Sequence, residues 1–124
     1  MELQDSDDWH GYGQTFTEDG VYLEHHHGTF RGRQQILAWL VPVMEPCRGW
    51  AFPVDWVCID GNRVVHRWQN RLPGRRPDGT YYEFAGITVM EYAGGGQFSF
   101  QEDMYNRYET DQVVAEWKAA QSKT

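Results

Sequence analysis

The chain has 124 residues, the size of a single domain spanning residues 1–124, and its formal net charge is −7. An acidic surface repels phosphate backbones and anionic lipid, so the composition argues against nucleic-acid and membrane partners. The first residues are polar and lack the apolar run of a signal peptide or a membrane span, which predicts a cytoplasmic protein.

Aromatic residues are abundant, with six Trp, seven Tyr and six Phe. So much ring surface in a short chain suits a broad sheet face or the lining of an apolar pocket, although ordinary core packing uses part of it. Cys47 and Cys58 stand in no CxxC pair and at no metal-ligand spacing. We expect buried free thiols, with a single disulfide as the alternative.

The first half of the chain predicts two helices around one strand. Asp7 or Asp8 can cap a short helix in which Trp9, Tyr12 and Phe16 are spaced to share a face. Residues 18–20 read as a turn, residues 21–27 as a strand and residues 29–32 as a short connection. Residues 33–44 form the clearest helix, with apolar side chains at helical spacing and a proline near the end.

The second half is mostly β. Residues 50–59 predict one strand or two short pieces, and residues 63–72, 80–92 and 97–106 predict strands separated by turns at 60–62, 73–79 and 94–96. Thr110 or Asp111 can cap a final helix. Because hairpins dominate, we expect an α+β fold in which a curved antiparallel sheet is wrapped by helices around a central pocket.

Alternation along residues 63–72 places His66, Trp68 and Asn70 on the inward face. A buried His or Asn needs partners, because an unpaired polar group costs about 1–3 kcal/mol, so these residues belong either to a core hydrogen-bond network or to a site. On the last strand, strict alternation turns Glu102 inward with the two phenylalanines and Asp103 outward. One β-bulge would exchange these two acids.

The run His25-His26-His27 resembles a metal site at first sight. In a strand, however, His25 and His27 share one face and His26 the other, so zinc would need a ligand from elsewhere. We therefore expect a solvent-facing or pocket-rim cluster and no metal. No GxSxG, GxxxxGK[ST] or GxGxxG motif occurs, which leaves acid–base chemistry by carboxylates and histidines in an aromatic pocket.

Several segments together resemble SnoaL-like proteins of the nuclear-transport-factor-2-like superfamily. They are FTEDGVY at 16–22, GTFRGR at 28–33 before a helix, IDGNRVV at 59–65, DG at 78–79 before FAGITV at 84–89, and EDMYN at 102–106. The resemblance covers nearly the whole chain. It implies a cone-shaped α+β fold with a deep pocket, a homodimer and, in most of its enzymes, no cofactor. Those enzymes include polyketide cyclases, ketosteroid isomerases, limonene epoxide hydrolases and scytalone-type dehydratases, while other members only bind ligands or proteins.

The resemblance also suggests roles for single residues. Glu24 stands where ketosteroid-isomerase-like members have a base carboxylate, and Asp103 matches the first Asp of an R-D-Y-F-D run in limonene epoxide hydrolases. The other two polar groups of those hydrolases fall on Trp68 and Asn70, which argues against epoxide hydrolysis because Asn cannot protonate an epoxide oxygen. Few residues precede Trp9, where relatives carry a long helix over the pocket. We therefore expect either a more open pocket or a chain start that is not the natural one.

The expected function is that of a cofactor-free acid–base enzyme, of isomerase, cyclase, dehydratase or hydrolase type, acting on a small apolar or polycyclic molecule. The alternatives are a ligand- or protein-binding module without chemistry and a dimerisation domain that fills its own pocket. A carboxylate in an aromatic pocket has a raised pKa, which suits an acid or base near neutral pH. The candidate catalytic residues are Asp103 or Glu102, with His66 or His26 as partner, and Glu24. The candidate substrate-binding residues are Tyr12, Trp39, Trp56, Trp68, Asn70, Phe84 and Tyr105.

Overall fold

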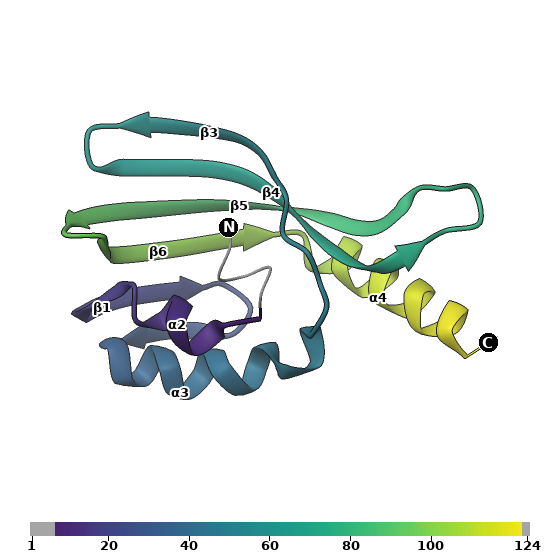
Figure 1. Ribbon diagram of the computed structural model, residues 1–124, viewed down its shortest axis with the longest axis horizontal. Helices are drawn as coiled ribbons and strands as arrows, with labels where there is room; N and C mark the ends of the chain where they lie inside the picture. The colour runs from purple at the N-terminus through teal and green to yellow at the C-terminus, as the bar shows by residue number, and fades with distance from the viewer. Residues whose placement is uncertain (1–6, 123–124) are drawn as a thin grey trace.

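A computed structural model describes residues 7–122 as one curved, open sheet of six strands and three α-helices (Figure 1). The strand order is β2-β1-β6-β5-β4-β3. This is the α+β architecture that the sequence predicts. In chain order the elements are α2 (Trp9–Gly13), β1 (Phe16–Glu24), β2 (Gly28–Arg31), α3 (Arg33–Met44), a 3₁₀ turn (Glu45–Cys47), β3 (Val54–Asp60), β4 (Arg63–Arg75), β5 (Tyr81–Gly94), β6 (Gln97–Tyr105) and α4 (Arg107–Gln121).

The pairing of β1 with β6 is parallel, whereas the other neighbouring strands of the sheet pair antiparallel. It joins the first strand of the sheet to the last strand in the chain, with Glu24 opposite Asp103. Two carboxylates from distant parts of the sequence therefore become neighbours, and this one pairing positions the candidate site.

The first half of the chain differs from the prediction in its boundaries. The first helix, capped by Asp8, ends at Gly13, and Phe16 begins β1. Residues 18–20, expected to form a turn, lie inside β1, where the pairing with β6 shifts register between Phe16 and Val21. β1 then ends at Glu24, and residues 28–31 pair with it as β2. Within the irregular stretch, the Gly20 carbonyl accepts a hydrogen bond of 2.7 Å from the backbone N–H of Gly32.

The helices α2 and α3 lie together over the β1–β2 end of the sheet (Figure 1). The helix predicted at 33–44 is confirmed, and Pro42 lies within its last turn. Ile36 and Leu40 are its buried residues. They pack in a core of mostly aromatic side chains, namely Trp9, Tyr12, Phe16, Tyr22 and Phe52. The aromatic surplus of the sequence is therefore used largely to attach α2 and α3 to the sheet.

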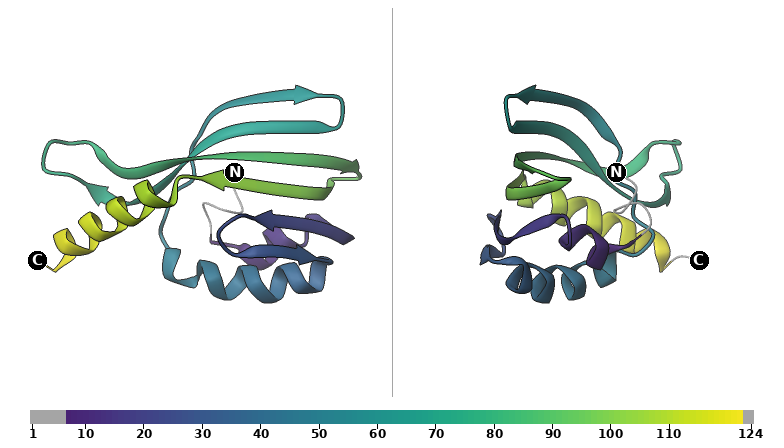
Figure 2. Two further views of the ribbon diagram at one scale, coloured as in Figure 1. Left: turned by 180° about the vertical axis from the view of Figure 1, so that it is seen from behind. Right: turned by 60° about the vertical axis from the view of Figure 1, so that its left-hand side comes forward.

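The last helix, α4, lies under the far end of the β4–β5 hairpin (Figure 2). Asn106, rather than Thr110 or Asp111, caps it by accepting hydrogen bonds from the backbone N–H groups of Tyr108 and Glu109. Its inward side, which includes Val113 and Trp117, packs on Leu72, Tyr82 and Phe84 of the sheet. Over residues 7–122 no helix is long and apolar enough to cross a membrane. The expectation about the missing opening helix concerns residues 1–6, which lie outside the described part.

The inward face of β4 is confirmed, since His66, Asn70 and Leu72 are buried. Of the two arrangements left open for β6, strict alternation is wrong: Gln101 and Asp103 point inward and are buried, and Glu102 does not. The bulge that the sequence allowed accounts for this, because the register with β5 shifts between Phe98, opposite Tyr92, and Phe100, opposite Glu91. Cys58 is exposed rather than buried, Cys47 is half-buried, and both thiols are free.

Candidate active site

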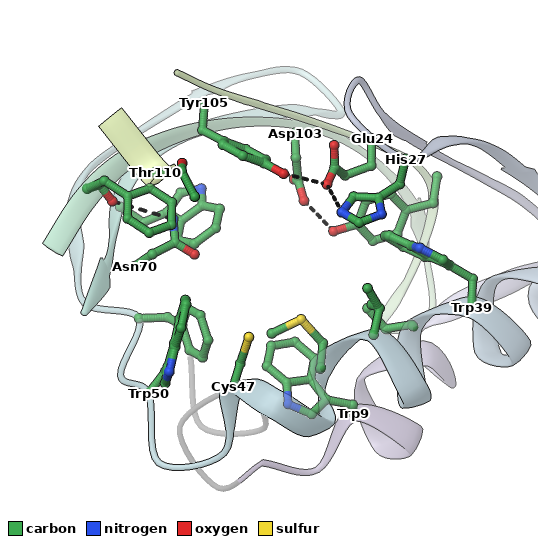
Figure 3. Close-up of a pocket in the computed structure, with 17 residues that line it drawn as sticks. Trp9, Glu24, His27, Trp39, Cys47, Trp50, Asn70, Asp103, Tyr105 and Thr110 are labelled. Carbon is green, nitrogen blue, oxygen red and sulfur yellow. Dashed lines mark hydrogen bonds and ion pairs between the residues drawn. The ribbon is translucent and has the colours of Figure 1, made fainter. Parts of the chain in front are cut away.

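A cavity of about 190 Å³ lies between the inner face of the sheet and α2 and α3 (Figure 3). Its floor carries Glu24 and Asp103, and aromatic rings form most of its walls. The lining residues are Trp9, Tyr22, Glu24, His27, Trp39, Leu40, Val43, Met44, Cys47, Trp50, Phe52, Trp68, Asn70, Phe84, Asp103, Tyr105 and Thr110. The cavity therefore combines an apolar enclosure with a few converging polar groups, as small-molecule sites do.

Asp103, only 6% exposed, accepts hydrogen bonds from three side chains. Thr88 Oγ1 and Gln101 Nε2 donate to its Oδ1 at 2.8 and 2.9 Å, and the Tyr22 hydroxyl contacts its Oδ2. Gln101 also donates to Tyr22 at 3.1 Å and accepts from the Tyr12 hydroxyl at 2.7 Å. These contacts fix the position of the carboxyl group within the cavity floor.

The direction of one of these bonds follows from chemistry. The Trp68 indole, which can only donate, gives its N–H to Thr88 Oγ1 at 2.8 Å. The Thr88 hydrogen is then free for Asp103, so Oδ1 must accept. With the amide of Gln101 also donating to Oδ1, a proton on this carboxyl group belongs on Oδ2, facing Tyr22.

Burial raises the pKa of Asp103, with the charge of Glu24 adding to the shift, while the hydrogen bonds from Gln101, Tyr22 and Thr88 oppose it. Burial likewise raises the pKa of Tyr22 well above its ordinary value, as the nearby Asp103 charge also does. Tyr22 is therefore a neutral donor, and the protonated form of Asp103 is favoured relative to a carboxyl group in water.

Glu24, the second buried carboxylate, has different partners. The His26 backbone N–H donates to its Oε1 at 2.7 Å, the Tyr105 hydroxyl donates to its Oε2 at 2.8 Å, and His27 Nε2 lies 3.3 Å from Oε2. Figure 3 shows Tyr105, Glu24 and His27 linked along the floor of the cavity, which is drawn at the top of that view. Because Glu24 ends β1, the turn that follows folds its own backbone and side-chain groups around the carboxylate.

The position of Trp68 in the cavity wall depends on a close approach between β4 and β5. Gly86 lies opposite Trp68, and a Cβ at this position would stand 2.9 Å from the indole ring. A glycine here lets the ring lie across β5, where its N–H reaches Thr88. Asn70, 8% exposed, donates a long hydrogen bond of 3.4 Å to the Phe84 carbonyl. This long bond holds its amide only loosely.

The structure brings together two of the predicted catalytic residues, Glu24 and Asp103, and most of the predicted walls. His26 stands beside them, but it holds Glu24 through its backbone while its ring packs on Tyr105. The other predicted residues lie outside the cavity. Glu102 contacts His25 at 2.6 Å, and His66 is buried further along the sheet. Tyr12 donates its hydroxyl hydrogen to Gln101, and Trp56 is 45% exposed on β3.

Sequence reasoning missed Tyr22, His27, Thr88 and Gln101. Alternation gives the signal for Gln101, since it shares a face with Asp103, and the pairing with Glu24 follows only from the sheet order. The three histidines form the turn between β1 and β2 rather than a strand, so each faces a different partner. Within residues 7–122 no three His, Cys, Asp or Glu side chains gather as metal ligands do.

Comparison with known proteins agrees with this architecture. The profile of the SnoaL-like domain matches residues 1–99, about four-fifths of the chain. The chain belongs to the SnoaL-like domain family. No curated protein matches this SnoaL-like domain.

Solved structures share the fold of this SnoaL-like domain at low identity. An LEH-like epoxide hydrolase from M. tuberculosis superposes with a TM-score of 0.75 at 15% identity, covering 98% of this chain and 87% of that one. A candidate SnoaL-like polyketide cyclase from Shewanella putrefaciens gives 0.74 at 12% identity, with 94% and 80% covered. A protein with a ketosteroid isomerase-like fold from Catenulispora acidiphila, in complex with trimethylamine, gives 0.64 at 20%, with 84% and 79% covered. These likenesses establish an NTF2-like cone fold.

Proposed function

We propose that this SnoaL-like domain is a cofactor-free enzyme that transfers a proton within a small apolar or polycyclic carbonyl compound. The observation that carries the proposal is the pair of buried carboxyl groups, Glu24 and Asp103, that line one aromatic cavity with different partners. Carboxyl groups in contrasting surroundings suit opposite roles, one as an ionised base and one as a neutral hydrogen-bond donor.

Glu24 is the base in this mechanism. As a carboxylate it removes a proton from the carbon beside the substrate carbonyl, and the C–H electron pair moves into an enolate. The protonated Glu24 returns the proton to a second carbon, which restores the enzyme and isomerises the substrate. The same enolate begins aldol-type cyclisation and dehydration. Tyr105 and the His26 backbone N–H orient the carboxylate for this transfer.

Asp103 and Tyr22 stabilise the enolate oxygen. When Asp103 is protonated on Oδ2, the Tyr22 oxygen accepts hydrogen bonds from Asp103 and Gln101, and the Tyr22 hydrogen is released toward the cavity. A neutral donor in a buried site stabilises developing negative charge without reorganisation. Asn70, held by one long bond, supplies a second donor.

Proton exchange tests the base directly. We expect the wild-type protein to exchange the α-protons of cyclic and steroid ketones for deuterium in D₂O, followed by NMR. Glu24→Gln should lower this rate by about 10²–10⁴-fold, the usual contribution of a general base. The matched control is Glu102→Gln, which changes an outward carboxylate and should leave the rate unchanged. Absence of exchange with every ketone, or equal rates in wild type and Glu24→Gln, would overturn the proposal.

A second pair of variants tests Asp103. Asp103→Asn keeps a donor toward Tyr22, and Asp103→Leu removes it. We expect the Leu variant to exchange more slowly than the Asn variant, by up to about 10²–10³-fold, the cost of losing an oxyanion donor, because Tyr22 then loses the hydrogen bond that releases its own hydrogen toward the enolate. Equal rates in the two variants would contradict the assigned role of Asp103.

A ligand-binding module without chemistry is the second candidate. One observation favours it: the three donors to Asp103 are protein side chains, so this carboxyl group is fully engaged before any ligand enters. This alternative predicts that ketones quench the fluorescence of Trp9, Trp39 and Trp50, which line the cavity, while their α-protons do not exchange.

A further inference from the structure

A second space lies beside the cavity, in a groove along α4. The groove, about 390 Å³, shares His27, Tyr105 and Thr110 with the cavity. Its remaining wall comes from α4 alone and consists of Arg107, Asp111, Val114, Ala115 and Lys118. Tyr105, whose hydroxyl binds Glu24, is therefore a common wall between the catalytic carboxylate and this second space.

Helical spacing places these residues on one face. Relative to Arg107 they stand at i+3, i+4, i+7, i+8 and i+11, which is three turns of a helix. Cations mark both ends of the groove, and the small apolar side chains of Val114 and Ala115 form its middle. From Thr110, which lines both spaces, to Lys118 the helix rises about 12 Å.

The two cations are not equivalent. Arg107 is paired with Asp111 at 3.2 Å, so its charge is already balanced. The ion pairs found within residues 7–122 leave Lys118 without a carboxylate partner, on a chain whose net charge is −7. An anion that reaches Lys118 along the groove therefore meets an unpaired cation in an otherwise acidic protein.

Volume points to a ligand that occupies both spaces. At about 190 Å³ the cavity is smaller than the roughly 300–1,000 Å³ typical of ligand pockets, and the groove lies directly beyond its Tyr105–Thr110 side. We propose that the substrates are amphipathic carboxylates: an apolar ring enters the cavity, a hydrocarbon tail crosses Val114 and Ala115, and the carboxylate binds Lys118. This assignment rests on the proposed function, because it takes the cavity as the place of the reacting ring.

Binding of 2-naphthyl alkanoates of increasing chain length, each compared with its primary amide, tests the proposal through tryptophan fluorescence. We expect a carboxylate to bind roughly two- to fivefold more tightly than its amide once the tail spans the groove, as for a solvent-exposed ion pair, and less so in high salt. Lys118→Gln should abolish this preference. Arg63→Gln, which removes an equal charge from the start of β4, should preserve it. A preference that survives Lys118→Gln, or that Arg63→Gln removes equally, overturns the proposal.

A steric variant tests the path of the tail. Ala115→Trp should weaken long-tailed naphthyl carboxylates and leave naphthalene binding unchanged, whereas Gln112→Trp, on an exposed position of α4 outside the groove, should affect neither. Equal binding of the long carboxylates by the two variants would overturn the tail path. The outcome is separable from that of the proposed function: loss of ketone exchange with a retained carboxylate preference refutes only the enzyme, and the reverse pattern refutes only the groove.

Discussion

The inner face of the sheet is covered at one end and open at the other. At the β1–β6 end, under α2 and α3, Gln101 and Asp103 are buried and fully hydrogen-bonded. At the β3–β4 hairpin the same face carries Val57 and Ile59, which are 52% and 71% exposed. The same face of the sheet therefore buries a carboxyl group and an amide at one end and exposes aliphatic side chains at the other. Coverage by the helices, rather than the polarity of the strands, creates the site.

The largest effect should come from removing an aromatic ring at the covered end. Phe16 is completely buried and packs between Tyr12 and Tyr22. Phe16→Ala should therefore lower the free energy of unfolding by about 3–5 kcal/mol, the usual cost of a phenylalanine-sized cavity. Urea denaturation followed by tryptophan fluorescence measures this loss. A change below about 1 kcal/mol, typical of the surface, would show that the two ends are packed alike.

Breaking the polar network should cost less. Thr88 is 1% exposed, accepts from Trp68 and donates to Asp103. Thr88→Val leaves the indole N–H without its acceptor, so we expect a loss of about 1–3 kcal/mol in the same denaturation assay. Thr29→Val, at an exposed position of β2, is the matched control and should change little. Equal effects of the two changes would mean that the network contributes nothing to stability.

The pH dependence of stability should reveal Asp103 itself. Burial raises its pKa in the folded state above the ordinary value of 3.8, so the folded protein binds a proton more tightly than the unfolded chain. The resulting stability is fully present below about pH 3.8 and is lost as pH rises through the folded pKa. Each tenfold difference in proton affinity between the folded and unfolded states contributes about 1.4 kcal/mol.

The side chain of the Asp103→Asn variant cannot titrate. As pH rises through this range, the free energy of unfolding of the variant should therefore increase relative to that of the wild type. Urea unfolding of both proteins at intervals from about pH 4 to about pH 8 measures the difference. Parallel pH curves for the two proteins would contradict a raised pKa at Asp103.

The smallest effect should come from the open end. Ile59 lies on β3 and is mostly exposed, so Ile59→Thr, which keeps a β-branched side chain, should shift the unfolding free energy by no more than about 0.5 kcal/mol. A loss comparable to that of Phe16→Ala would show that this end of the face is covered in solution, and size-exclusion chromatography at several protein concentrations would reveal whether a second copy covers it.

Much of the fold was predictable from local patterns. The helix at 33–44, the strand with His66 and Asn70 inward, and the turns between β3, β4, β5 and β6 follow from periodicity and turn residues. Family resemblance supplied Glu24 and Asp103 as candidates. Strict alternation misassigned the face of β6 because the register with β5 shifts between Phe98 and Phe100, and a period of two does not show where a bulge lies.

Sequence patterns were enough for most of the elements, for the inner row of β4 and for the acidic groups available for chemistry. Only the tertiary structure decided that Glu24 and Asp103 share a cavity, because the parallel pairing of β1 with β6 joins opposite ends of the chain and no local propensity encodes it. The same pairing folds the histidine turn around Glu24 and brings Tyr22 to Asp103. The helices then bury both acids, and burial raises the pKa of Asp103.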